Sequence, residues 1–198
     1  MKRASMVSVV VGAAGLALVG GCDKKETGAP SRAPTGATGA TAPAGAAPAT
    51  GAGQAALPAT LFLTSAPADA KTVEEVKAAS VKPGDTVTVR GRIGGDVKPF
   101  VEDRAVFTIV GPGIPSCSDN KGDMCKTPWD YCCETKEDIA EHMATVQVVD
   151  ASGKAALRVG FEGLNGLKGL SEVIVVGTVA EVSGPVLVVN ATGIHRVN

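Results

Sequence analysis

Hydrophobic and polar residues alternate in short stretches along the second half of the chain. In residues 86–93, Val87, Val89 and Ile93 share one face, while Arg90 and Arg92 lie with two threonines on the other. This period of two predicts a β-strand with one buried face. Other stretches that alternate, or that are rich in Val and Ile, are also predicted to be strands: residues 105–110, 145–149, 155–161, 173–182 and 186–197.

Helical signals are few and short. Thr72 and Glu75 have the spacing of a capping box, which predicts a helix that ends near residue 80. Thr135 and Asp138 have the same spacing and predict a second helix that ends near residue 143. Leucines recur at every third position in residues 164–170, which predicts a short helix or 3₁₀ segment.

The predicted order is two strands, an insertion at residues 111–143, a hairpin of two strands, a short helix and two final strands. The clearest strands are residues 87–93, 173–179 and 186–189. In this order they resemble the OB-fold, a small Greek-key β-barrel with a helix between its third and fourth strands. The resemblance covers residues 81–198 and implies a mainly β, OB-like barrel of five to six strands with short helices. The insertion and the sixth strand depart from that pattern, and another small β-barrel or a sandwich is the alternative.

The N-terminus has the parts of an export signal in the usual order. Lys2 and Arg3 precede an apolar segment at residues 6–19, which is shorter than the roughly 20 residues of a membrane span. The segment ends in Val19, Gly20, Gly21 and Cys22. This ending resembles the lipobox of bacterial lipoproteins. It implies that residues 1–21 are a signal peptide and that Cys22 carries lipid. The protein would then be anchored on the cell membrane, facing the periplasm or the cell exterior. A secretory signal with an incidental cysteine, or an uncleaved anchor, is the alternative.

Residues 22–60 are composed mainly of Ala, Gly, Pro and Thr. Such a composition buries too little apolar surface to offset the entropy of the chain. We therefore predict a disordered spacer between the anchor and a folded domain at residues 61–198.

Four cysteines lie within the insertion: Cys117, Cys125, Cys132 and Cys133. Exported proteins meet oxidising conditions, so these cysteines are predicted to form two disulfides, with the pairing left open. Four thiolates binding Zn²⁺ are the alternative, but the spacing lacks the paired C-x2-C knuckles of zinc modules. A redox-active pair is disfavoured because the chain has no C-x-x-C sequence.

Trp129 and Tyr131 stand next to the cysteine pair and are the only Trp and Tyr of the chain. Aromatic side chains of this kind often anchor binding surfaces, so we consider them candidate ligand contacts. The alternative is that Trp129 packs over a disulfide or over one end of the sheet. Arg90 and Arg92, on the polar face of the first strand, are also candidate ligand contacts.

Charge and motifs limit the possible functions. Residues 58–198 contain 14 Lys and Arg against 18 Asp and Glu, a net charge of −4. Nucleic acid is disfavoured as a partner, because phosphate binding needs a basic groove with stacking aromatics. His142 and His195 are isolated in the sequence, and no catalytic motif is present. We predict no cofactor and no enzymatic activity.

The sequence thus predicts a membrane-anchored lipoprotein with an OB-like binding or scaffold module for a protein, glycan or small ligand. The alternatives are a nucleic-acid-binding OB-fold protein and a metal-binding protein that uses the four cysteines of the insertion.

Overall fold

One mixed sheet of six strands organises residues 56–197, the part of the chain that this computed structural model describes. The predicted signal peptide, Cys22 and most of the predicted spacer lie outside these residues. The strands are β1 (Lys71–Thr72), β2 (Thr86–Ile93), β3 (Val106–Val110), β4 (Met143–Gln147), β5 (Glu172–Ser183) and β6 (Val186–Val197).

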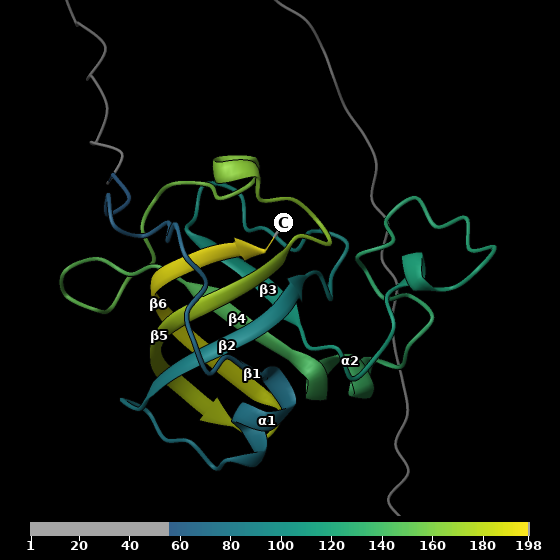
Figure 1. The fold of residues 1–198 in the computed structure, drawn as a ribbon, viewed down its shortest axis with the longest axis horizontal. Coiled ribbons are helices and arrows are strands. Elements are labelled where there is room, and N and C mark those ends of the chain that lie inside the picture. Colours follow the sequence, from purple (N-terminus) through teal and green to yellow (C-terminus); the bar gives the residue numbers. More distant parts are fainter. Residues whose placement is uncertain (1–55, 198) are drawn as a thin grey trace, which may run out of the picture. The chain divides into compact units, whose positions relative to one another are not determined.

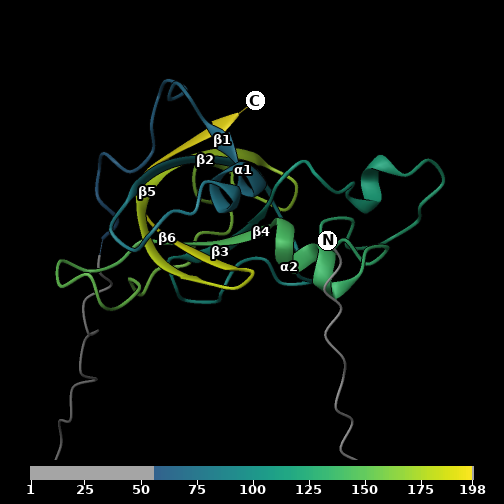
Figure 2. The same ribbon diagram turned by 90° about the horizontal axis from the view of Figure 1, so that it is seen from below.

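The strand pairs form a closed ring (Figures 1 and 2). β2 pairs antiparallel with β3, and β3 pairs antiparallel with β4. β4 pairs parallel with β6, β6 pairs antiparallel with β5, and β5 returns to pair antiparallel with β2. The mainly β prediction is therefore confirmed. β1 stands outside the ring and runs parallel to β2.

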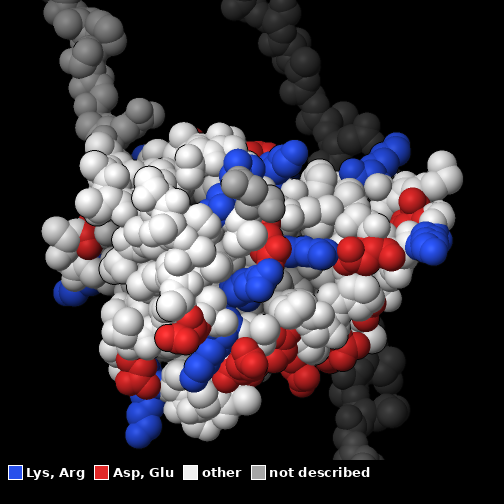
Figure 3. Space-filling model, viewed as in Figure 1, with Lys and Arg blue, Asp and Glu red and all other residues white. Residues whose placement is uncertain are grey.

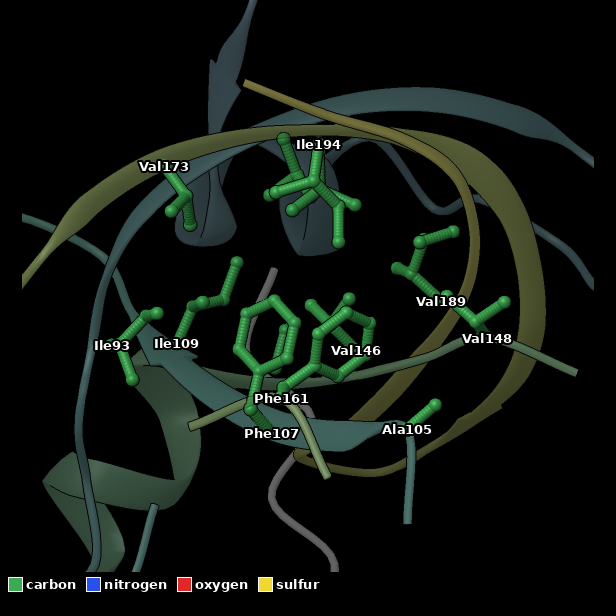
Figure 4. Close-up of a cluster of buried hydrophobic side chains, with 14 of the residues drawn as sticks. Ile93, Ala105, Phe107, Ile109, Val146, Val148, Phe161, Val173, Val189 and Ile194 are labelled. Atoms are coloured by element: carbon green, nitrogen blue, oxygen red, sulfur yellow. The ribbon is translucent and has the colours of Figure 1, made fainter. Parts of the chain in front are cut away.

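The apolar faces of these strands meet inside the ring (Figure 4). In β2, Val87, Val89 and Ile93 are buried, as the alternation predicts. Phe107 of β3 and Phe161 pack edge to face, with ring centroids 5.2 Å apart and an interplanar angle of 81°. Both rings are fully buried. Burial of apolar area at about 25 cal/mol per Å² makes this interior the main source of stability.

The two long strands β5 and β6 bend around the interior. Their pairing shifts register between Val176 and Gly177 and again between Val179 and Glu181. A Cβ atom on Gly177 would lie 2.3 Å from the carbonyl oxygen of Asn190, so only glycine fits where the two backbones come this close. A glycine within an otherwise apolar strand often marks a bulge or bend, so the sequence predicts an irregularity at Gly177, and the register shift confirms it.

Both predicted capping signals begin helices. Thr72 and Glu75 form a complete capping box before α1 (Val73–Ala78). Thr135 accepts a hydrogen bond from the backbone of Asp138 before α2 (Lys136–His142). Two 3₁₀ helices, η1 (Cys117–Asp119) and η2 (Leu164–Gly166), complete the helices of the described residues. Within residues 56–197 no helix has both the length and the apolar character needed to cross a membrane.

The predicted strand at residues 155–161 is wrong. Only one bridge forms there, between Val149 and Ala156. The chain then leaves the sheet so that Phe161 enters the interior and packs on the rings of Phe62 and Phe107. Backbone pairing in this segment ends at Leu157, whose N–H donates to the carbonyl oxygen of Val148. Beyond Leu157 the apolar positions reflect the burial of individual side chains and not the pairing of a strand.

Candidate functional site

The connection from β3 to β4 corresponds to the predicted insertion at residues 111–143, and we call its central part, residues 116–133, the cysteine insertion. It extends away from the sheet next to α2 (Figures 1 and 2). Few of its side chains are apolar and buried, so its position depends on a small number of specific contacts with the sheet.

The first contact starts on β2. Arg92 donates a hydrogen bond to Asp119 Oδ2 over 2.7 Å, and the same oxygen accepts from the backbone and hydroxyl of Ser116, at 3.0 and 2.8 Å. Ser116 is fully buried. Burial acts to raise the pKa of Asp119, but the hydrogen bonds from Ser116 and Arg92 outweigh it and hold that pKa below its ordinary value. The start of the insertion is thereby fixed to β2.

The second contact uses the two aromatic residues. Trp129 Nε1 donates to the carbonyl oxygen of Val97 over 3.1 Å, and the carbonyl oxygen of Trp129 accepts from Gly95 over 2.8 Å. The indole ring lies directly over Gly169. Trp129 thus joins the insertion to two loops of the sheet, as expected for a residue that packs over one end of it.

Tyr131 is only 1% exposed, so it does not belong to an open aromatic surface, and its role as a ligand contact stays a prediction. Its backbone adopts the left-handed conformation, with φ of 57°, and the chain turns the ring inward there. Burial raises the pKa of Tyr131 to about 12. The phenol therefore stays neutral over the physiological range.

The four cysteines converge within the insertion in two groups that share Cys117. Cys132 Sγ lies 3.1 Å from Cys125 Sγ and 3.4 Å from Cys117 Sγ. The three sulfurs all lie within 4.8 Å of one another. A second group, Cys117, Asp123 and Cys133, meets the same limit. All four cysteines are free thiols in this structure, and the disulfide prediction remains a prediction.

Two aspartates hold the backbone on which these thiols stand. Asp123 Oδ1 accepts from the backbone N–H of Cys125 over 2.8 Å, and its Oδ2 lies 3.5 Å from Cys133 Sγ. Asp130 Oδ1 accepts from the backbone N–H of Cys132 over 3.0 Å. The turns that these aspartates make place sulfurs from distant positions in the sequence side by side.

Three of the thiols, Cys125, Cys132 and Cys133, have raised pKa values. A hydrogen bond to Asp123 is the main reason that the pKa of Cys125 is raised to about 11 and that of Cys133 to about 12. A hydrogen bond to Cys125 is the main cause for Cys132, whose pKa is raised to about 12. Reactive cysteines have lowered pKa values, because the thiolate is the attacking species. The raised pKa values therefore make Cys125, Cys132 and Cys133 poor nucleophiles in the absence of a metal ion.

A groove of about 600 Å³ lies along β2, where the sheet meets the insertion. Arg90 and Arg92 form its β2 side, and residues 111–115 and Tyr131 contribute to its other walls. Both arginines are already paired: Arg90 with Glu172, and Arg92 with Asp119. Acidic and basic side chains also lie next to one another across the face in Figure 3. The groove is polar but has no surplus of positive charge.

A larger hollow of about 740 Å³ lies between α1, α2 and the turn from β5 to β6. Lys77, which lines it, donates to the carbonyl oxygens of Ala140, Glu141 and Pro185 at 2.6–2.9 Å. The pKa of Lys77 is lowered, mainly because the ammonium group is partly buried. Lys77 therefore ties α1 to neighbouring elements, and we assign this hollow no ligand.

The structure thus brings Arg90, Arg92 and Tyr131 to one groove, and the four cysteines to two groups that share Cys117. The contacts of Trp129 with Val97, Gly95 and Gly169 fix the insertion against the sheet. Sequence reasoning did not find the partners of the arginines, Glu172 and Asp119. Glu172 carries no motif and becomes a partner only because β5 pairs with β2.

Comparisons of the sequence with models of known protein families and with curated proteins found no match. The function of the chain therefore has to be inferred from the sheet, the groove and the thiol cluster.

Proposed function

We propose that this chain is a membrane-anchored extracytoplasmic lipoprotein whose folded part is an OB-like β-barrel. In this proposal the barrel binds a partner and catalyses no reaction. The observation that carries the proposal is the order of strand pairs around the ring, together with the groove on β2. The anchor rests on the lipobox that ends at Cys22.

The OB-like assignment rests on connectivity. Taken in chain order, β2, β3, β4, β5 and β6 supply five strands that close a ring, with the last strand placed between the third and the fourth. The one parallel pair within the ring joins β4 to β6. A five-stranded Greek-key barrel is the arrangement of an OB-fold. The connection from β4 to β5, which carries the helix in that fold, here contains only the 3₁₀ helix η2.

The groove is the surface that we assign to the partner. OB-folds commonly bind ligands over their second and third strands, here β3 and β4, and at the adjoining loops. This groove lies instead on β2, the first strand of the ring, and reaches β3 only at Val110. Here the insertion after β3 builds a wall beside β2, and the groove lies between them. Because its charges are paired in opposite signs, it favours a polar peptide or a glycan over a polyanion.

The alternative of nucleic-acid binding has little support from the groove. A backbone phosphate would have to displace Glu172 from Arg90 or Asp119 from Arg92, and the domain has a net negative charge. Stacking aromatics usually complete such a surface. Tyr131 is buried, and Trp129 is occupied with Val97 and Gly169.

Membrane anchoring is tested by Cys22→Ser in the full chain. We expect the unaltered protein in the membrane fraction and the variant, still able to fold, in the soluble fraction, because the variant has no sulfur to acylate. Cys133→Ser, which removes a different thiol, is the matched control and should stay with membranes. Equal partitioning of Cys22→Ser and the parent protein would exclude the lipid anchor.

Binding in the groove is tested by a photo-crosslinking amino acid at Pro112, an exposed groove residue, in intact cells. The control places the same amino acid at Val182, which is exposed on β5 outside the groove. We expect one discrete adduct from position 112 and none from position 182. No adduct from position 112, or the same adducts from both positions, would argue against the groove as a binding surface.

A further inference from the structure

Three cysteine sulfurs in the insertion surround one point, although they come from three separate turns. Cys117 belongs to η1, Cys125 follows a turn at residues 121–122, and Cys132 follows the left-handed Tyr131. Cys132 Sγ faces both of the others at similar distances, 3.1 and 3.4 Å. The sulfur of Cys132 therefore has two sulfur neighbours, whereas a cysteine positioned for a disulfide has one.

These separations fit ligands of a shared metal ion better than bonded sulfurs. A disulfide bond is about 2.05 Å long. Thiolates at about 2.3 Å from Zn²⁺ in tetrahedral geometry are about 3.8 Å apart. The observed 3.1 and 3.4 Å lie closer to the second value, and the third sulfur pair also stays within 4.8 Å.

We propose that Cys117, Cys125 and Cys132 together bind one thiophilic metal ion, with Zn²⁺ as the ion that fits their number and geometry. Soft thiolate ligands select Zn²⁺ or Cu⁺ over Mg²⁺ and Ca²⁺. On binding, the three thiols release three protons and each sulfur forms one bond to the metal, so no oxidant or reductant takes part. Three protein ligands leave the fourth tetrahedral position open.

The surroundings of the three sulfurs suit a cation. Cys117 is buried, while Cys132 is exposed, so the cluster has a closed side and a side that a metal ion can enter. Asp123 and Asp130 hold the backbone N–H groups of Cys125 and Cys132 and bring negative charge to the cluster. Outer partners of this kind orient the ligands and tune their affinity.

The fourth cysteine stands apart from this site. Cys133 Sγ lies 3.5 Å from Asp123 Oδ2 and belongs to the second group, which shares only Cys117 with the first. Two disulfides would require all four cysteines equally, whereas the metal site requires three. Cys133 is therefore the matched control that separates the two possibilities.

A metal ion at this place would hold the insertion in its folded form. Its three ligands span residues 117–132, so one ion would join the beginning, middle and end of the insertion. The insertion also supplies Asp119 and Tyr131 to the groove. The site goes beyond the proposed binding function, and its loss would leave the membrane anchor unchanged.

The test uses full-length protein with Cys22→Ser in every sample, so that the thiols of the insertion are the only ones present. Reduced, metal-free protein is loaded with Zn²⁺, freed of excess metal by gel filtration, and analysed for zinc per chain by plasma mass spectrometry. We expect one zinc per chain for this parent. Cys125→Ser should lose the zinc, and Cys133→Ser should retain it.

Cys125→His supplies a second, independent readout. Histidine is a zinc ligand but cannot form a disulfide, so this variant should recover zinc binding. The circular dichroism of each variant shows whether the sheet is folded. Cu⁺ in place of Zn²⁺ shows which ion binds in preference.

Three results would overturn the site. The first is protein isolated from cells with both disulfides formed, and with thiols that alkylate only after reduction. The second is equal loss of zinc from Cys125→Ser and Cys133→Ser. The third is a folded Cys125→His variant that binds no zinc.

Discussion

The closed sheet and the cysteine insertion are stabilised in different ways. Inside the sheet, apolar side chains from several strands fill one continuous interior, in which Phe107 and Phe161 are fully buried. The insertion buries Tyr131 and Cys117 and otherwise depends on polar turns, the Arg92–Asp119 pair and Trp129. An apolar interior can be formed by many different combinations of apolar side chains, whereas the position of the insertion depends on individual residues. This difference places the candidate chemistry in the insertion and the stability in the sheet.

The largest effect should come from the interior of the sheet. Phe107→Ala removes a fully buried ring that contacts Phe161 and Phe100. We expect the free energy of unfolding to fall by about 3–5 kcal/mol, measured by urea denaturation. Val182→Ala, at an exposed position on β5, is the control and should change it little. A similar loss in both variants would mean that the ring encloses no well-packed interior.

The next effect concerns the place where the insertion meets β2. A Cβ atom on Gly94 would lie 2.5 Å from the carbonyl oxygen of Trp129 and 2.9 Å from the ring of Tyr131. Gly94→Ala should displace the insertion and destabilise the protein by about 1–3 kcal/mol, as overpacking does. Limited proteolysis should then cleave within residues 116–133.

Gly160→Ala is the matched control, because its Cβ would have one neighbour, at 3.8 Å. It should leave both the thermal midpoint and the proteolysis pattern unchanged. If Gly94→Ala behaves in the same way, the insertion does not pack on β2 as described.

Tyr131 gives a spectroscopic measure of the same contact. Since Tyr131 is the only tyrosine, ultraviolet absorbance should report its pKa as about 12 in the folded protein and near 10.0 in denaturant. Because the pKa of Tyr131 is higher in the folded than in the unfolded protein, the contribution of its neutral phenol to stability is complete below pH 10. This contribution is lost as the pH rises from 10 towards 12. Tyr131→Phe should remove that part of the alkaline loss. A folded-state pKa near 10 would mean that the ring is exposed.

The smallest effect should come from the ion pair between β2 and the insertion. Arg92 and Asp119 are each about 40% exposed. A double-mutant cycle with alanine at both positions should give a coupling free energy of about 0.2–1 kcal/mol. The control pair, Lys98 and Glu102, is far more exposed and should couple more weakly. Coupling that is stronger in the control pair would contradict the role of Arg92 in docking the insertion.

Much of the sheet could be predicted because alternation reports directly which face of a strand is buried. The bounds of β2 follow from Val87, Val89 and Ile93, and the bulge follows from Gly177. β1 could not be predicted, because two residues carry no period. Residues 155–161 misled the prediction because burying Leu157 and Phe161 as individual side chains produces the same alternation as a strand.

The candidate site was less accessible to sequence reasoning. The spacing of the four cysteines does not show which sulfurs meet, since the turns held by Asp123 and Asp130 decide this. The sequence also contains no signal that Tyr131 turns inward. Its burial depends on a left-handed backbone at a non-glycine residue and on the approach of Gly94.

Native-state hydrogen exchange on the full chain tests most directly whether the sheet and the insertion are separate units of stability. We predict that amides paired within the sheet, such as those of Val89 and Val175, exchange only through global unfolding. The amides of Asp119 and Asn120 should exchange through a local opening of lower free energy, and Cys125→Ser should accelerate these amides alone. Exchange of both sets at one common free energy, shifted together by Cys125→Ser, would contradict the account.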